Sequence, residues 1–178
     1  MDFFSIDAID QDTAQALLNI YPETTADLFE KDYARRYGNE EDAHAAQISD
    51  YLDSVAAFLS QDDRYMFALR EGDVIIAALR VIHMGADHWY LEALGTAPEY
   101  RGRGCARRLL TETLRCMRVL QARSIVSVVK QDNTASRAAH EACGFKDTGK
   151  SAKDMQGAEI EDCLVYQYDY PNRNLKIY

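Results

Sequence analysis

The spacing of apolar residues changes near residue 60, and this change limits the chain to folds that combine helices with a sheet. Before that point, apolar side chains recur every three or four residues, which predicts amphipathic helices. These helices are expected at about 12–20, 25–37 and 41–60. After it, runs rich in aromatic and β-branched residues predict strands. These strands are expected at 65–70, 74–82 and 89–96, so the sequence predicts an α+β fold.

Turn-forming residues separate these runs. Thr25 stands where an N-cap of the second helix would lie, and Gly38 follows the last turn of that helix. Glu71-Gly72-Asp73 and Gly85-Ala86-Asp87 separate the three strands by lengths that are typical of hairpins. We therefore expect the three strands to form an antiparallel meander.

The second half of the chain alternates between the two kinds of element. Helices are expected at 105–120 and 134–143, and strands at 124–129, 146–153 and 160–168, with Gln156-Gly157 in the last turn. The run at 124–129 is apolar on both faces, which indicates a buried strand. No repeat or linker divides the sequence, so one domain is expected over 1–178. It would have a helical, acceptor-side part at 1–60 and a sheet at 61–170.

Composition and charge narrow the classes of function. The net charge is −9, from 20 Lys and Arg against 29 Asp and Glu, which argues against a nucleic-acid partner. The N-terminus lacks the basic and apolar regions of a signal peptide, and the longest apolar run, 74–79, is too short to span a membrane. The four cysteines have no C-x-x-C spacing, so no metal is expected. A cytoplasmic protein is the resulting expectation.

The stretch from Arg101 to Ala106 lies between a predicted strand and a predicted helix and reads Arg-Gly-Arg-Gly-Cys-Ala. A helix begins with unpaired N–H groups and the positive end of its dipole. Glycines allow that backbone to approach an anion closely, and arginine side chains add positive charge. The stretch therefore predicts a phosphate site. It matches neither the P-loop pattern nor the dinucleotide-binding pattern, so nucleotide hydrolysis and NAD chemistry are not expected.

The segment from Leu94 to Gly104 resembles the central motif of the GNAT superfamily of acetyltransferases. The family pattern is Arg/Gln-x-x-Gly-x-Gly/Ala after a strand, and Arg101, Gly104 and Ala106 occupy its three defined places. A second element follows at the expected distance, because Asn133 precedes a short helix that Gly144-Phe145 closes. The resemblance implies α/β/α layers around a mixed, mostly antiparallel sheet. Its two central strands, here 89–96 and 124–129, splay apart.

The resemblance also implies an N-acetyltransferase that uses acetyl-CoA or another acyl-CoA as cosubstrate. The backbone of Leu94 to Thr96 would pair with the pantetheine arm, the N–H groups of Arg103 to Ala106 would hold the pyrophosphate, and Asn133 would lie beside the pantetheine. The implied cofactor-binding residues are Leu94, Gly95, Thr96, Arg101, Gly102, Arg103, Gly104, Cys105, Ala106 and Asn133.

Two residues are candidates for catalysis. Glu92 is the candidate base, because alternation along the strand would put it on one face with Leu94 and Thr96 and family members often use an acid there. The family often has a tyrosine, seven residues after Asn133, that is thought to protonate the departing CoA thiolate. Here that position is His140. Either His140 substitutes, another hydroxyl does, or no side-chain acid is needed.

A third residue, Cys105, offers another route. It stands near a helix N-terminus, which could lower its thiol pKa and permit an acyl-cysteine intermediate. The resemblance favours direct transfer in a ternary complex instead.

The acceptor stays open at this point. A small-molecule amine is the first hypothesis, and the acidic residues of the helical part would favour a cationic one. A protein acetyltransferase for N-termini or lysines is the alternative within the enzyme class. A non-catalytic acyl-CoA-binding module is the rival outside it. The resemblance also allows a homodimer.

Overall fold

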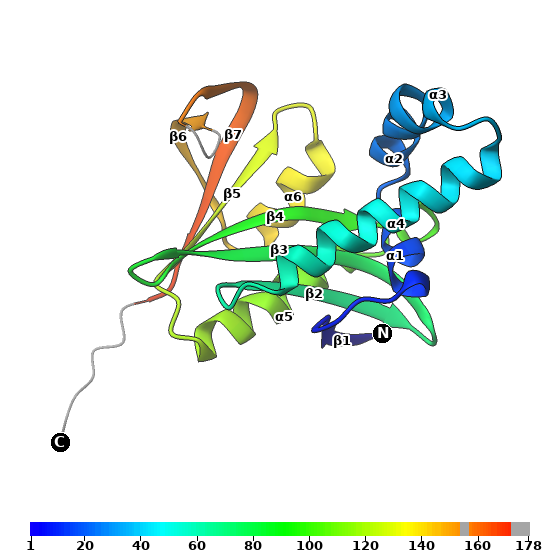
Figure 1. Ribbon diagram of the computed structural model, residues 1–178. Helices are drawn as coiled ribbons and strands as arrows, with labels where there is room; N and C mark the ends of the chain where they lie inside the picture. The colour runs from blue at the N-terminus through cyan, green and yellow to red at the C-terminus, as the bar shows by residue number, and fades with distance from the viewer. Residues whose placement is uncertain (154–156, 172–178) are drawn as a thin grey trace. The chain divides into compact units, whose positions relative to one another are not determined.

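The computed structural model describes residues 1–153 and 157–171 (Figure 1). The chain divides into two compact units. Unit 1 contains Met1–Arg80 and Ala93–Leu109; unit 2 contains Val81–Glu92 and the described residues after Leu109. Seven strands follow the order β1-β2-β3-β4-β5-β7-β6 in the sheet. Helices flank the mostly antiparallel sheet, so the predicted α+β class is confirmed.

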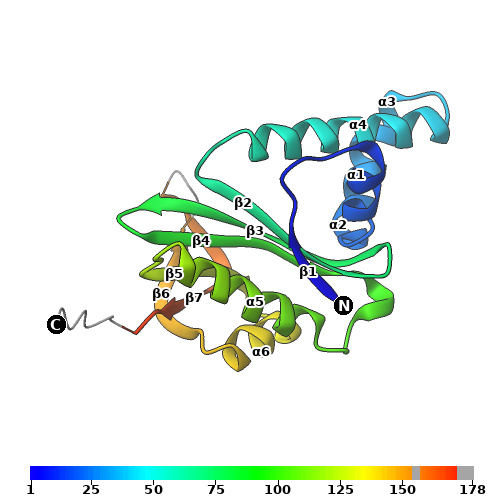
Figure 2. The same ribbon diagram turned by 90° about the horizontal axis from the view of Figure 1, so that it is seen from below.

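Unit 1 contains most of the helices. Its elements are β1 (Asp2–Ser5), α1 (Gln11–Leu18), α2 (Pro22–Leu28), the π-helical turn η1 (Phe29–Tyr33), α3 (Ala34–Arg36), α4 (Glu40–Leu59), β2 (Arg64–Glu71), the first part of β3 (Val74–Gly85), the end of β4 (His88–Thr96), η2 (Pro98–Tyr100) and the start of α5 (Cys105–Val119). Asp10 caps α1 by accepting from Thr13 N at 2.8 Å, and Asn39 caps α4 by accepting from Asp42 N at 2.8 Å. Helix α4 packs against α1 and β2 (Figures 1 and 2).

The expected N-cap at Thr25 is wrong, because the helix begins earlier. Pro22 occupies the first position of α2, where a fixed φ favours a helix and the missing N–H costs nothing. Thr25 lies inside α2, and its hydroxyl donates to the carbonyl oxygens of Tyr21 and Pro22 at 2.9 and 3.2 Å. The predicted helix at 25–37 is therefore three short segments, α2, η1 and α3.

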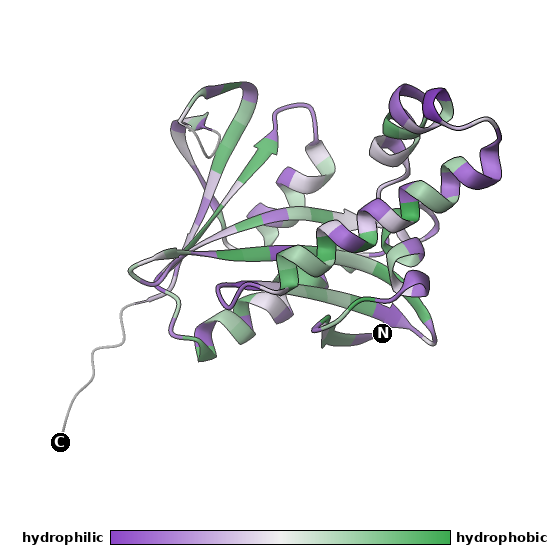
Figure 3. Cartoon of the chain, viewed as in Figure 1, coloured by the Kyte–Doolittle hydropathy of each residue, from purple (hydrophilic) through white to green (hydrophobic). Residues whose placement is uncertain are grey.

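The core of unit 1 lies between its helices and its strands. Buried side chains from α1, α4, β2 and β3 and from the segments that follow β1, α1 and β4 form one cluster: Ile6, Leu17, Ile20, Val55, Met66, Ala68, Ala78 and Ala97. In Figure 3 the strands β2 and β3 are largely apolar, whereas α2 and α3 carry many polar residues. Strands β2 and β3 are neighbours joined by the turn at Gly72, where φ is +59°. This confirms the first predicted hairpin.

Unit 2 contains the rest of β3 and α5, the start of β4, and β5 (Ser124–Lys130), α6 (Thr134–Ala142), β6 (Lys146–Lys153) and β7 (Glu159–Asp169). Ala86 and Asp87 form the turn between β3 and β4, both with positive φ, which confirms the second hairpin. Strand β5 runs parallel to β4 and antiparallel to β7. Gln156 of the predicted last turn lies outside the described residues.

Candidate active site

The loop from Arg101 to Ala106 leaves its backbone open at the start of α5. Gly102 and Gly104 have φ of +74° and +78°, which only glycine adopts readily. Within the described part of the chain, a Cβ at Gly102 would meet nothing within 4 Å, and one at Gly104 would meet only Arg107 Nη2, at 4.0 Å. Helix α5 begins at Cys105. Arg108 N donates to Gly104 O, and the N–H groups that come before Arg108 in the chain belong to the first turn, which has no earlier helical carbonyl to bind. The loop therefore fits an anion held by backbone N–H groups.

The Arg101 side chain is engaged with α2. Its two terminal nitrogens donate to the Glu23 carboxylate at 2.6 and 3.0 Å, and Nε donates to Thr96 O at 3.1 Å. This bidentate contact lowers the pKa of Glu23 to about 2. Arg103 instead lies over the Tyr100 ring, 5.1 Å from its centroid. That Arg101 binds phosphate stays a prediction, and its charge is already paired.

Cys105 does not have the lowered pKa that its place near a helix N-terminus could give. Its side chain is buried in unit 1, and Sγ lies 3.5 Å from the Tyr100 carbonyl oxygen. Burial raises the pKa of the thiol, and the nearby charge of Glu71 adds to that effect. Burial outweighs the charges of Arg103 and Arg108, which would lower the pKa. An acyl-cysteine route therefore lacks a ready thiolate.

Strand β4 contains one left-handed residue, Ala93, whose φ is +51°. A left-handed residue inside a strand is typical of a bulge and breaks the alternation of side chains. The prediction that Glu92 shares a face with Leu94 and Thr96 assumed regular alternation, which does not hold across Ala93. Glu92 itself is half-buried. Burial of the Tyr90 hydroxyl raises the pKa of Tyr90, and the nearby charge of Glu92 raises it further.

Pairing of β5 in unit 2 differs along the strand. With β4 it runs from His88–Ser124 to Leu91–Ser127, whereas pairing with β7 continues to Lys130–Cys163.

Asn133 caps α6, because its side-chain oxygen accepts from Ser136 N at 3.0 Å. Gly144 ends the helix with a φ of +91°. The predicted start and end of this helix are confirmed; a contact of Asn133 with pantetheine stays a prediction.

His140 is buried in unit 2, with 1% of its surface exposed. Nδ1 lies 2.8 Å from the carbonyl oxygen of Ser136, and the ring packs against Phe145 and Tyr166 at centroid distances of 5.0 and 5.7 Å. Among the residues that the structure describes, Nε2 finds no hydrogen-bond partner. Burial lowers the pKa of His140. These contacts fit a neutral packing residue better than the protonated acid that was predicted.

Residues 17–145 match the model of the acetyltransferase (GNAT) family, which spans more than half of the chain. The chain belongs to the GNAT family. It is therefore an acetyltransferase, and the family predicted from the loop and from Asn133 is confirmed. A search of curated proteins found no match.

Solved structures with the same fold cover nearly the whole chain of this GNAT protein. PaiA N-acetyltransferase from Thermoplasma acidophilum, in complex with coenzyme A, is 15% identical, with a TM-score of 0.66 over 96% of this chain and 100% of that one. A mutant of spermidine N-acetyltransferase from Vibrio cholerae is 14% identical, with a TM-score of 0.68 over 95% of each chain. Ribosomal-protein-alanine N-acetyltransferase from Brucella melitensis is 18% identical, with a TM-score of 0.60 over 96% and 100%.

Two surface cavities of this acetyltransferase were not predicted as sites. In unit 1 a cavity of about 380 Å³ lies among the helices. It is lined by Gln15, Leu18, Asn19, Pro22, Thr25, Ala26, Phe29, Glu30, Glu40, His44, Gln47 and Ile48. The Phe29 and His44 rings stack there at 4.1 Å, and buried Gln47 donates to Thr25 O at 2.9 Å. The helical spacing predicted the helices but not the π-helical turn, which brings Phe29 to His44.

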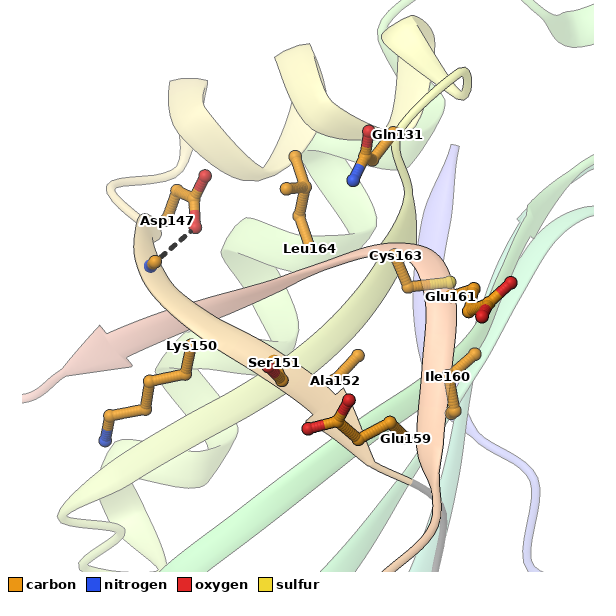
Figure 4. Close-up of a pocket in the computed structure, with 11 residues that line it drawn as sticks. Gln131, Asp147, Lys150, Ser151, Ala152, Glu159, Ile160, Glu161, Cys163 and Leu164 are labelled. Carbon is orange, nitrogen blue, oxygen red and sulfur yellow. Dashed lines mark hydrogen bonds between the residues drawn. The ribbon is translucent and has the colours of Figure 1, made fainter.

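The second cavity, of about 330 Å³, lies in unit 2 along the β6–β7 hairpin (Figure 4). It is lined by Gln131, Asp147, Gly149, Lys150, Ser151, Ala152, Glu159, Ile160, Glu161, Cys163 and Leu164. Asp147 accepts from Gly149 N at 2.9 Å, and register shifts interrupt the pairing of β6 with β7. Such irregular pairing has no clear signal in the sequence.

No helix within the described ranges has the length and apolarity to cross a membrane.

Proposed function

We propose that this acetyltransferase transfers an acetyl group from acetyl-CoA to the primary amine of a small cationic molecule. The observation that carries the acceptor class is the unit 1 cavity. Two carboxylates, Glu30 and Glu40, line it, and none of its described lining residues is Lys or Arg. Its volume of about 380 Å³ suits a small molecule. An amine with additional positive charge would be attracted to such a cavity.

The same unit contains the backbone that would hold acetyl-CoA. The N–H groups of Arg103 to Ala106 would receive the pyrophosphate, because the loop is open and leads into a helix of 15 residues. Leu94, Gly95 and Thr96 would pair with the pantetheine. The coenzyme A complex of the Thermoplasma protein, which has the same fold, supports this choice of cosubstrate.

The proposed reaction is a direct attack in a ternary complex. The acceptor nitrogen forms a bond to the thioester carbon, the C–S bond breaks, and CoA leaves as a thiolate that takes up a proton. The amine must first lose a proton, and Glu92 is the proposed base. Because His140 is buried and its pKa is lowered, we propose that solvent rather than His140 protonates the thiolate.

The relatives in fold differ in acceptor, since one name specifies spermidine and another a ribosomal-protein alanine. Acceptor choice is therefore the point to test. The purified protein is incubated with acetyl-CoA and a panel of polyamines, aminoglycosides, amino acids and peptides with free N-termini or lysines, and thiol release is recorded. We expect a polycation of small size to be the best acceptor. Preference for peptides would replace the proposed acceptor class. If none of the amines caused thiol release, an acyl-CoA-binding module would be favoured.

A charge variant connects that preference to the cavity. Replacing both carboxylates, Glu30→Gln with Glu40→Gln, should raise KM for the best polyamine about tenfold and leave KM for acetyl-CoA unchanged. Glu41→Gln is the matched control, because Glu41 is exposed on the same helix but does not line the cavity. Equal KM values in all three proteins would place the acceptor elsewhere.

A further inference from the structure

The turn between α1 and α2 contacts the backbone of β4 inside unit 1. The Tyr21 hydroxyl donates to the carbonyl oxygen of Ala93 at 2.5 Å, across 72 residues of sequence. Ala93 is the left-handed residue of β4, with a φ of +51°. A residue other than glycine rarely adopts this conformation unless its surroundings hold it there. The Tyr21 hydroxyl supplies one such contact.

Gly95 makes room for the Tyr21 ring. A Cβ at Gly95 would lie 2.6 Å from Ile20 Cγ2 and closer still to Tyr21 Cε1. No real side chain fits at such a distance, so the ring lies directly on the β4 backbone. Ring and hydroxyl together therefore fix the short stretch from Ala93 to Gly95.

That contact also sets the direction of one N–H group. The carbonyl of Ala93 and the N–H of Leu94 belong to the same peptide, which is planar and trans, so the two groups point in opposite directions. With its carbonyl held by Tyr21, this peptide directs the Leu94 N–H away from the α1–α2 turn. An N–H fixed before the reaction is the kind of donor that stabilises a developing oxyanion.

We propose that Tyr21 is a positioning residue, which holds the Ala93–Leu94 peptide so that the Leu94 N–H polarises the carbonyl of the bound thioester. The proposal rests on the proposed function, because it needs acetyl-CoA along Leu94–Thr96. It also links the acceptor to the reaction, since Pro22 and Thr25, the neighbours of Tyr21 in α2, line the unit 1 cavity. An acceptor that displaces this segment would alter the donor as well.

Tyr21→Phe tests the proposal, because it removes the hydroxyl and keeps the ring over Gly95. We expect kcat to fall on the order of tenfold, since the donor is disordered rather than lost, with KM for acetyl-CoA and affinity for CoA unchanged. Tyr33→Phe is the matched control: it removes a hydroxyl of the same unit that donates to Asp50 at 2.9 Å, away from β4. A purely structural role would make both variants lose stability alike and leave kcat unchanged.

An infrared measurement needs no acceptor. Acetyl-CoA labelled with ¹³C at the carbonyl is bound to each protein, and the carbonyl stretch is compared with that of free acetyl-CoA. We expect a lowered frequency in the parent and in Tyr33→Phe, and a return toward the free value in Tyr21→Phe. A frequency equal in all three proteins would overturn the role of Tyr21. A shifted carbonyl without turnover on any amine would instead refute the proposed function and retain the positioning role.

Discussion

The Arg101–Ala106 loop of unit 1 and helix α6 of unit 2 both carry residues of the family pattern, yet the structure uses them differently. In the loop, Gly102 and Gly104 expose backbone at the start of a long helix. In α6, Asn133 caps the helix and His140 packs inside it. The comparison teaches that a residue at a motif position acts through its surroundings. Open backbone suits ligand binding, whereas buried rings mainly stabilise the fold.

The largest expected effect comes from blocking the open loop. Gly104→Glu should lower affinity for CoA at least about a hundredfold, because a carboxylate would stand where the pyrophosphate is expected and repel it. Gly72→Glu is the matched control, since Gly72 also has positive φ and open space around it but lies in the β2–β3 turn. Titration calorimetry with CoA measures both variants. Unchanged affinity in Gly104→Glu would move the pyrophosphate away from the loop.

A smaller effect is expected from the buried residue of α6. His140→Phe should keep kcat within about threefold of the parent, because a neutral, buried imidazole is a poor acid. It should also change how stability depends on pH. The pKa of folded His140 is lowered, so as the pH falls through about 6.5 the unfolded chain takes up a proton that the folded protein does not. The free energy of unfolding of the parent therefore falls as the pH drops below about 6.5, by up to about 1.4 kcal/mol per pH unit.

Urea unfolding at pH 7.5 and pH 5.5 measures this difference. The parent should lose more free energy of unfolding between the two values than His140→Phe does. His83→Phe should behave as the parent, because His83 is only half-buried and its ring lies tilted against Trp89, with the centroids 4.6 Å apart. A drop in kcat of a hundredfold in His140→Phe would restore the acid role and remove the contrast between the two regions.

The sequence was informative where local pattern decides structure. Period and turn residues predicted α1, α4, α5, the hairpins and the ends of α6, but not the three short segments at 22–36. The pattern of Arg101, Gly104 and Ala106 predicted the family. Contacts between distant segments were not predictable in this way. Burial raised the Cys105 pKa against the helix N-terminus, and the Tyr21–Ala93 bond accompanies a bulge that alternation does not reveal. Such effects depend on residues that are brought together only by folding.

The smallest expected effect concerns the ion pair that ties α2 to the loop. The Glu23 and Arg101 side chains are 68% and 47% exposed, so the pair should add less than about 1 kcal/mol to stability despite its short contacts. Glu23→Gln keeps the shape of the side chain and removes its charge. Because Arg101 would then carry an unpaired charge beside the loop, we expect CoA affinity to rise about two- to threefold and this gain to vanish at high salt. The Asp27–Lys31 pair offers the control, because Asp27→Asn breaks an exposed contact of α2 at 2.8 Å that does not involve the loop. Lower CoA affinity in Glu23→Gln alone would show that the pair orders the loop rather than neutralising the Arg101 charge. Glu23 would then be part of the binding site.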